Sequence, residues 1–149
     1  MENKYFEKFL DELKEKCLKF YKNNLVSIVI FGSYANGKNT PSSDIDILII
    51  LEKTKSNYER YIDFFSIIEN IKVLKQLKNK NIYPLISPII KSAKYLNVKL
   101  PYLWSTKFRI IYDKNHFFSN FLRELEEFIE NKIEFFDTPM PHYIIKNGQ

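Results

Sequence analysis

Two short apolar runs separated by a loop constrain the fold of this 149-residue chain more than any other feature. The runs Leu25–Phe31 and Ile45–Leu51 are rich in β-branched residues and too short for helices, so they predict two buried strands. Residues 32–43 between them contain two of the chain's three glycines, together with Ser, Thr, Asn and Pro. These residue types are typical of turns, so the segment predicts a loop with room for one helical turn after Ser33.

Three amphipathic patterns predict helices around these strands. Residues 3–21 place an apolar side chain at every third or fourth position among Lys and Glu. A second pattern runs from the helix-capping residues Ser56 and Asn57 to about residue 77. A third pattern begins near Asp113 or Lys114 and predicts the final helix.

Two further extended segments complete the expected sheet. Residues 82–90 are apolar, but Pro84 and Pro88 restrict them to an edge or bulged strand, because proline cannot donate a ladder hydrogen bond. Residues 107–112 predict a fourth strand, and residues 137–149 predict a short extended tail. The order helix, strand, strand, helix, strand, strand, helix predicts an α+β or α/β domain with a mixed sheet.

Length and composition limit the number of domains and the setting of the chain. The chain is 45% hydrophobic and 16% aromatic, and its length suffices for one core and not for two. We therefore expect a single domain, residues 1–149, in which residues 91–149 form a C-terminal extension on or beside the core. Cys17 is the only cysteine, and no apolar run approaches the roughly 18–20 residues that span a bilayer. These features favour a reduced, cytoplasmic setting without a membrane, and the net charge of +5 favours a polyanionic partner.

The loop holds the only concentrated chemical signal, a Gly-Ser pair followed by two aspartates. Asp44 and Asp46 lie two residues apart in an extended segment, so they project from one face with Cα atoms roughly 6.5–7 Å apart. Their oxygens can therefore hold one hard cation such as Mg²⁺. Gly32 lets the backbone approach a ligand, and Ser33 offers a hydroxyl and an amide where a helical turn begins. Free N–H groups at such a position attract phosphate.

The segments GSYANG (residues 32–37) and SDIDIL (residues 43–48) resemble the signature of the minimal, MNT-type nucleotidyltransferases of the DNA polymerase β superfamily. Members of that family show Gly-Ser, a short spacer and Asp-x-Asp with a hydrophobic strand behind it. The resemblance implies an α+β nucleotidyltransferase fold, with a mixed sheet flanked by helices. It also implies Mg²⁺-dependent transfer of a nucleotidyl group, AMP from ATP, to a protein or RNA hydroxyl with loss of pyrophosphate.

The same resemblance assigns roles to individual residues. Asp44, Asp46 and Ser33 would be catalytic, with Mg²⁺ held by the two aspartates. Gly32 and Ser33 would bind the triphosphate of ATP. Ser43, directly before the aspartates, is a further candidate for nucleotide binding. The alternative reading of these residues is a solvated strand entrance with Ser43 as a turn cap.

Two positions depart from the family pattern. Members have Arg where this chain has Asn36, so one cationic phosphate contact is missing unless Lys38 replaces it. Active members also carry a third acid on the next core strand, whereas residues 82–90 contain none and Ser87 lies where one is expected. Three other acids could substitute only if the fold brings them to the site: Asp63, Glu69 and Asp113.

The resemblance also suggests a cellular role. Many MNT-type proteins are antitoxins that silence HEPN-type ribonuclease toxins by adenylylating a tyrosine. The resemblance therefore implies a HEPN-type toxin protein or RNA as the acceptor and partner. It is also compatible with an oligomer of this chain. The alternative is a catalytically degenerate family member that acts as a nucleotide- or protein-binding module, which the missing third acid favours. The Asp-x-Asp motif of glycosyltransferases is a weaker match, because it lacks the Gly-Ser partner and normally lies in a larger domain.

Aromatic and histidine residues outside the loop give weaker signals. Tyr95, Tyr102 and Trp104 can either stack on a base or pack in the core, and packing is the commoner role. His116 and His142 are far apart and have no Cys or second His at ligand spacing, which argues against a zinc site.

Overall fold

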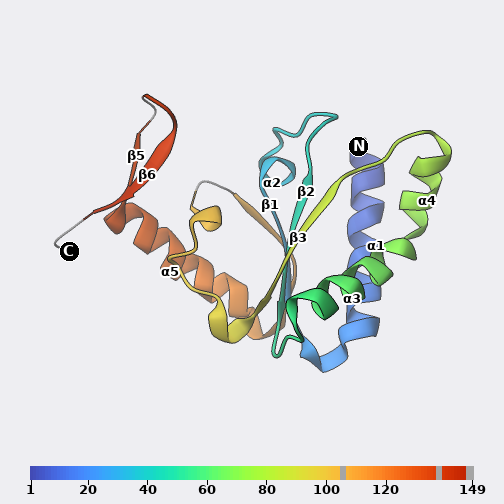
Figure 1. The fold of residues 1–149 in the computed structure, drawn as a ribbon, viewed down its shortest axis with the longest axis horizontal. Coiled ribbons are helices and arrows are strands. Elements are labelled where there is room, and N and C mark those ends of the chain that lie inside the picture. Colours follow the sequence, from blue (N-terminus) through green and yellow to red (C-terminus); the bar gives the residue numbers. More distant parts are fainter. Residues whose placement is uncertain (105–106, 137–138, 147–149) are drawn as a thin grey trace.

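A four-stranded sheet forms the centre of the computed structural model, which describes residues 1–104, 107–136 and 139–146 (Figure 1). Its strand order is β3-β2-β1-β4. The strands β1 and β2 are antiparallel, as are β1 and β4, whereas β2 and β3 are parallel. The predicted mixed sheet is therefore confirmed, with these strand bounds: β1, Leu25–Phe31; β2, Ile45–Leu51; β3, Ile86–Ser92; β4, Phe108–Asp113.

The central strands β1 and β2 are buried on both faces of the sheet. Every residue of β1 is buried, and Asp46 is the one residue of β2 that is not. Side chains alternate along a strand, so Ile28 and Ile30 face one apolar cluster while Val29 and Phe31 face the other. This double burial explains why the two runs are continuously apolar instead of alternating with polar residues.

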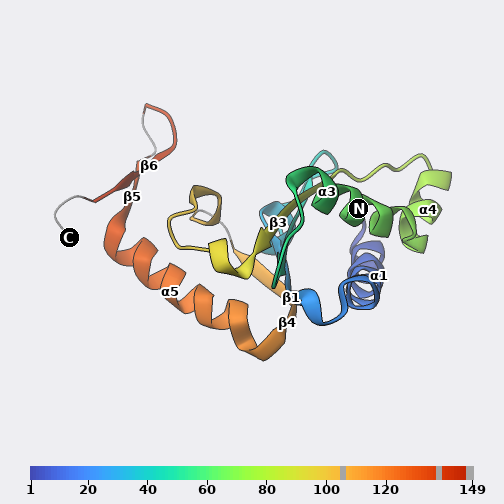
Figure 2. The same ribbon diagram turned by 60° about the horizontal axis from the view of Figure 1, so that its bottom comes forward.

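Helices cover the two faces of the sheet unequally (Figure 2). One cluster packs β1 and β2 against α1, Asn3–Tyr21, together with α3, Asn57–Glu69, and α4, Lys72–Asn79. The other cluster packs the opposite face against α5, Phe117–Lys132, and against side chains from the segment that ends at Trp104. Among the described residues, no helix is both long enough and apolar enough to cross a bilayer.

The single helix expected from residues 57 to 77 is wrong, because two helices occupy this stretch. Asn70 ends α3, and Ile71 adopts an extended conformation with φ −78° and ψ 118°. Ile71 is fully buried, so the break turns an apolar side chain into the core. The carboxylate of Glu12 then accepts a 3.1 Å hydrogen bond from the amide of Val73, which satisfies a first-turn donor of α4.

The outer strands show how proline sets the limits of the sheet. The β3 strand is an edge strand, as predicted, but it begins at Ile86, after Pro84. Pro88 lies within it, which an edge strand tolerates because one side needs no ladder partner.

Beyond α5, the strands β5, Ile133–Phe136, and β6, His142–Ile145, form a hairpin that projects from the end of the helix (Figure 1). Within the predicted extended tail, residues 142–145 form β6, while residues 137–138 and 147–149 lie outside the described residues.

Asp113 links the sheet to the final helix. Its carboxylate accepts hydrogen bonds from the Ser27 hydroxyl at 2.7 Å, from the amides of Phe118 and Ser119 at 2.8 and 2.9 Å, and from the Ser119 hydroxyl at 2.9 Å. Burial alone would raise the pKa of Asp113, but these hydrogen bonds together lower it. The helix begins at Phe117, slightly later than expected, because Asp113 and the turn after it cap its first residues.

We expect Asp113→Ala to lower the free energy of unfolding by about 2 kcal/mol, from lost charge-assisted hydrogen bonds and a lost helix cap. Chemical denaturation at pH 7 measures this loss. Glu127→Ala, on an exposed position of α5, is the control and should change stability by less than about 0.5 kcal/mol.

The stabilisation by Asp113 should also depend on pH. Because the pKa of Asp113 is lowered in the folded state, its contribution to the free energy of unfolding is fully present above the unfolded pKa of about 3.9 and disappears as the pH falls through the folded pKa. The difference between wild type and Asp113→Ala should therefore shrink below about pH 4.

Candidate active site

The two halves of the loop motif meet at one end of the sheet. Phe31, the last residue of β1, pairs with Asp46 near the start of β2. Gly32 and Ser33 follow directly, and Ser33 begins the one-turn helix α2, Ser33–Asn36. The structure therefore brings the Gly-Ser pair beside the Asp-x-Asp pair through strand pairing.

Gly32 lies against the carboxylate of Asp46. It has a φ of +71°, a conformation that glycine adopts without strain. A Cβ atom at this position would overlap Oδ2 of Asp46 and would lie 3.2 Å from its Cγ. The glycine is therefore required here for two reasons, its backbone conformation and the closeness of the carboxylate.

The two aspartates differ in their surroundings. Asp44 is exposed just before β2, whereas Asp46 is half-buried within the strand. Burial raises the pKa of Asp46, and the nearby negative charge of Asp44 raises it further. A cation would favour the ionised form of both groups and remove this repulsion. Two carboxylates at the start of a strand, one of them exposed to solvent, fit a magnesium ion that keeps water and phosphate ligands.

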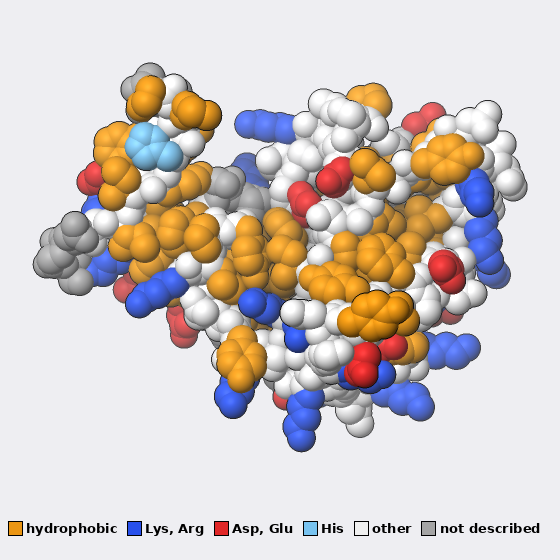
Figure 3. Space-filling model, in the orientation of Figure 1, with side chains coloured by type: hydrophobic (Ala, Val, Ile, Leu, Met, Phe, Trp, Pro, Cys, Tyr) orange, Lys and Arg blue, Asp and Glu red, His pale blue; other side chains and the backbone are white. Residues whose placement is uncertain are grey.

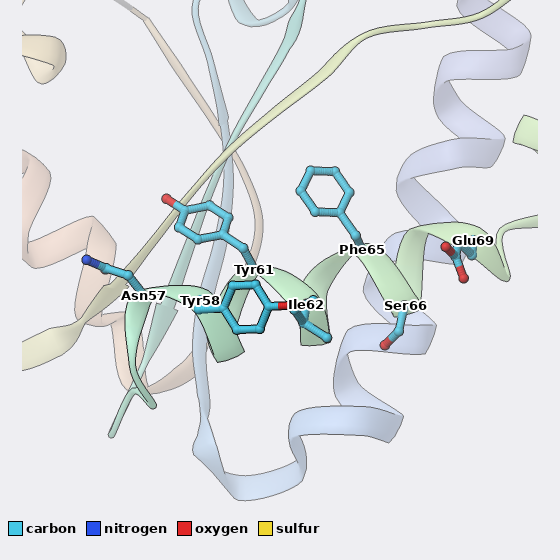
Figure 4. A pocket seen from close by; sticks show the side chains of 7 residues that line it. All are labelled: Asn57, Tyr58, Tyr61, Ile62, Phe65, Ser66 and Glu69. Atoms are coloured by element: carbon cyan, nitrogen blue, oxygen red, sulfur yellow. The ribbon is translucent and has the colours of Figure 1, made fainter.

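The third carboxylate is not found at the position where family members have it. Ser87 of β3 pairs with Asp46 in a parallel register, so it occupies the neighbouring position of the adjacent strand. Asp63 forms a 2.9 Å ion pair with Lys55, and Asp113 caps α5. Glu69 lies on α3, where it lines an apolar surface pocket (Figure 4). Within the described ranges, no three His, Cys, Asp or Glu residues lie close enough to hold a metal ion.

The remaining loop residues shape the turn between the two halves of the site. The hydroxyl of Ser43 accepts a 2.8 Å hydrogen bond from the amide of Thr40. The amide of Lys38 donates to Asn36 Oδ1 at 2.9 Å and to the carbonyl of Ser33 at 3.1 Å. Asn36 therefore stabilises the end of α2, and the Lys38 side chain is exposed beside it.

Tyr34 anchors the site to α1, a role that sequence reasoning did not identify. Its ring is buried and packs on Phe6, with 4.9 Å between ring centroids, and its hydroxyl accepts a 3.3 Å hydrogen bond from the amino group of Met1. An aromatic residue directly after Gly-Ser, opposite the apolar side of a predicted helix, is a signal that could have indicated this contact.

The aromatic residues considered for base stacking have different environments. Trp104 is buried, donates a 2.8 Å hydrogen bond to the carbonyl of Val98 and packs on Phe128, so it belongs to the core. Tyr102 is half-buried, 6.3 Å from the ring of Phe31. Tyr95 is 61% exposed.

Comparison with known proteins agrees with this geometry. Residues 10–96 match the model of a family described as the nucleotidyltransferase domain. The chain belongs to this family. The predicted family and fold are therefore confirmed, and the chain is a nucleotidyltransferase.

The curated relatives carry consistent names. A Methanocaldococcus jannaschii protein named "Putative protein adenylyltransferase MJ1305" is 34% identical over 134 residues, which cover 87% of each chain. A second protein from the same organism, "Putative protein adenylyltransferase MJ1379", is 39% identical over 48% of this chain and 74% of its own length.

Solved structures support the fold at low sequence identity. A spectinomycin adenyltransferase from Enterococcus faecialis, solved with ATP and spectinomycin, has a TM-score of 0.55 and 18% identity and covers 85% of this chain and 68% of its own. A toxin-antitoxin structure with AMP-PNP has a TM-score of 0.50 and 16% identity and covers 81% of this chain and 86% of its own. These two similarities concern the fold alone.

Proposed function

We propose that this chain is a Mg²⁺-dependent protein adenylyltransferase, which transfers AMP from ATP to a hydroxyl group of a protein. The observation that carries the proposal is the contact of Gly32 with Asp46, where the end of β1 meets the start of β2 and Asp44 lies nearby. The names of the relatives favour a protein acceptor over RNA.

Each residue of the site has a chemical role in this proposal. Asp44 and Asp46 would hold the magnesium ion, which neutralises charge on the triphosphate when it is bound. Gly32 lets the Asp46 carboxylate lie directly against the backbone at the end of β1, and Ser33 supplies a hydroxyl and the first amide of α2. Exposed Lys38 would add a positive charge at the outer end of the turn. In the reaction, the acceptor oxygen bonds to the α-phosphorus and the bond to the leaving pyrophosphate breaks.

A toxin-neutralising role is the cellular context that we propose. The MNT-type motif supports it, as does the fold that this chain shares with a protein of a toxin-antitoxin structure. In this view, a HEPN-type toxin would be the acceptor and the partner, in the cytoplasm. We also propose that residues 1–149 act as one domain, because α5 and the segment before β4 cover the second face of the sheet.

A nucleotide-binding module without catalysis is the second candidate. Ser87 favours it, because this residue pairs with Asp46 on the adjacent strand, where the family resemblance implies an acid in active members. The two candidates share nucleotide binding and differ in group transfer, so one experiment can separate them.

Thermal denaturation and label transfer, performed on the same protein, test the proposal. ATP with Mg²⁺ should raise the midpoint of unfolding, since a ligand stabilises the state that it binds. Incubation with α-labelled ATP and a HEPN-type toxin should label the toxin. Stabilisation without labelling would favour the binding module, and neither effect would contradict both candidates.

A further inference from the structure

A basic cleft lies at the end of the sheet opposite the aspartates. It consists of a groove of about 570 Å³ between α1 and α3 and a cavity of about 280 Å³ beside the end of β2, and Phe20 lines both. One carboxylate, that of Asp63, and six basic side chains line this cleft: Lys16, Lys19, Lys22, Lys53, Lys55 and Arg60. Figure 3 shows several Lys and Arg side chains along the lower edge of the molecule, where Figure 1 places the turn η1, Lys22–Asn24.

Most of the positive charge in the basic cleft is not neutralised by the protein. Asp63 pairs with Lys55, and this hydrogen bond raises the pKa of Lys55. The guanidinium of Arg60 donates to the carbonyls of Ile90 and Lys55, at 3.0 and 3.3 Å, which are neutral groups. The other four ammonium groups form no ion pair with any residue in the described parts of the chain. The basic cleft therefore presents a net positive surface to a ligand.

An exposed aromatic ring stands between the two hollows. Phe20 lies near the end of α1 and is 46% exposed. Its ring packs edge-on against the ring of Tyr21, with 5.1 Å between the ring centroids. A ring held by its neighbour and surrounded by ammonium groups is the arrangement on which nucleic-acid bases stack in proteins that bind single strands. A nucleic acid matches both features with one repeating unit, because each nucleotide carries a phosphate for the ammonium groups and a base for the ring.

Tyr21 supplies an unpaired buried donor in the wall of the cavity. It is 9% exposed, and its hydroxyl has no hydrogen-bond partner among the described residues. Burial raises the pKa of Tyr21, and nearby Cys17 and Asp63 add to the increase, so the hydroxyl stays protonated at neutral pH. A buried donor without a partner is unfavourable, and a phosphate oxygen that entered the cavity would be a suitable acceptor.

We propose that the basic cleft binds single-stranded RNA, with phosphates on the lysines and one base on Phe20. Lysines are point charges without the paired donors of arginine, so they hold the backbone without reading its sequence. The binding should therefore be sequence-independent and strongly dependent on salt.

The basic cleft is separate from the catalytic end of the molecule. Leu51 lines the cavity and Asp46 belongs to the site, and the five residue steps between them on β2 span roughly 17 Å. RNA in the basic cleft would therefore dock on the protein outside the site that the aspartates form. The inference does not depend on adenylyltransferase activity, and a binding measurement tests it independently.

Fluorescence polarisation with a labelled 12-nucleotide oligouridylate tests the proposal at 50 and 200 mM KCl. The triple variant Lys16→Gln, Lys19→Gln, Lys22→Gln should bind at least tenfold more weakly at 50 mM KCl. The slope of log K against log salt should fall in magnitude by about 2, at roughly 0.7 for each lost phosphate contact. The matched control is Lys72→Gln, Lys75→Gln, Lys78→Gln on α4, which removes equal charge from three exposed lysines with the same spacing.

The aromatic contribution is tested separately. Phe20→Ala should weaken binding at least fivefold without changing the salt slope, because it removes a stacked base and no charge. Phe135→Ala, at a 56% exposed position of β5, should have no effect. Equal losses in the two lysine triples, no loss in Phe20→Ala, or equal binding of an oligoglutamate peptide would each overturn the proposal, the last in favour of an acidic protein.

Discussion

Asp46→Asn is expected to abolish nucleotidyl transfer while leaving the fold intact. A neutral amide cannot balance the charge of a magnesium ion and a triphosphate as a carboxylate does, so the rate should fall on the order of 10³-fold. Label transfer from α-labelled ATP measures the loss. Asp11→Asn, an exposed position of α1, is the matched control and should retain activity.

Stability distinguishes a lost catalytic group from a damaged fold. Burial and Asp44 both disfavour the charged form of Asp46 in the folded protein. Asp46→Asn should therefore keep or raise the midpoint of thermal unfolding in the absence of ligand, and lose the increase that ATP with Mg²⁺ causes in the wild type. Full activity, or an unchanged ligand-induced increase, would contradict the assignment of Asp46 to the site.

The pH dependence of the wild type follows from the same cause. Because the pKa of Asp46 is raised, its protonation begins at a higher pH than for an ordinary aspartate as the solution is acidified. In the metal-free protein, the apparent affinity for Mg²⁺ should consequently fall on acidification, because the ligand must be deprotonated, and calorimetric Mg²⁺ titrations at decreasing pH measure this fall.

Gly32→Ala is expected to have the second largest effect, on both activity and stability. The new methyl group would overlap the Asp46 carboxylate and would also require a positive φ from an L-residue. We expect a loss of about 2–4 kcal/mol in the free energy of unfolding and of at least 10²-fold in activity, since the carboxylate must move. Denaturant titration and label transfer measure the two quantities.

Gly37→Ala provides the matched control for this variant. Gly37 also has a positive φ, +74°, but a Cβ atom there meets nothing within 4 Å. It should therefore show the backbone cost alone, about 1 kcal/mol, with little change in activity. In an Asp46→Ala background, Gly32→Ala should cost less than in the wild type, because the overlapping carboxylate is gone. Equal costs in the two backgrounds would mean that the contact with Asp46 is not the cause.

The local chemistry of the loop made the site predictable from sequence. Glycine and serine follow one apolar run, and two aspartates lie at the start of the next, so this spacing indicated which residues could approach one ligand. The strands β1 and β2 then followed from their unbroken β-branched character, since burial on both faces leaves no room for polar residues.

The limits of some elements were not predictable because they depend on distant partners. The break at Ile71 satisfies core packing and the Glu12 side chain, which is far away in the sequence. The start of α5 depends on Asp113, whose carboxylate also holds Ser27 of β1. Neither contact has a local signal that a periodic pattern could reveal.

The sequence by itself determined the family, the two central strands and the candidate ligands Asp44 and Asp46, because short-range spacing and residue type specify them. The tertiary structure alone decided that Gly32 touches Asp46 and that Asp113 caps α5 instead of lying beside the two aspartates. It also brought together the basic cleft from α1, the end of β2 and α3. These relations depend on strand register and helix packing, which are set by the burial of apolar surface throughout the chain.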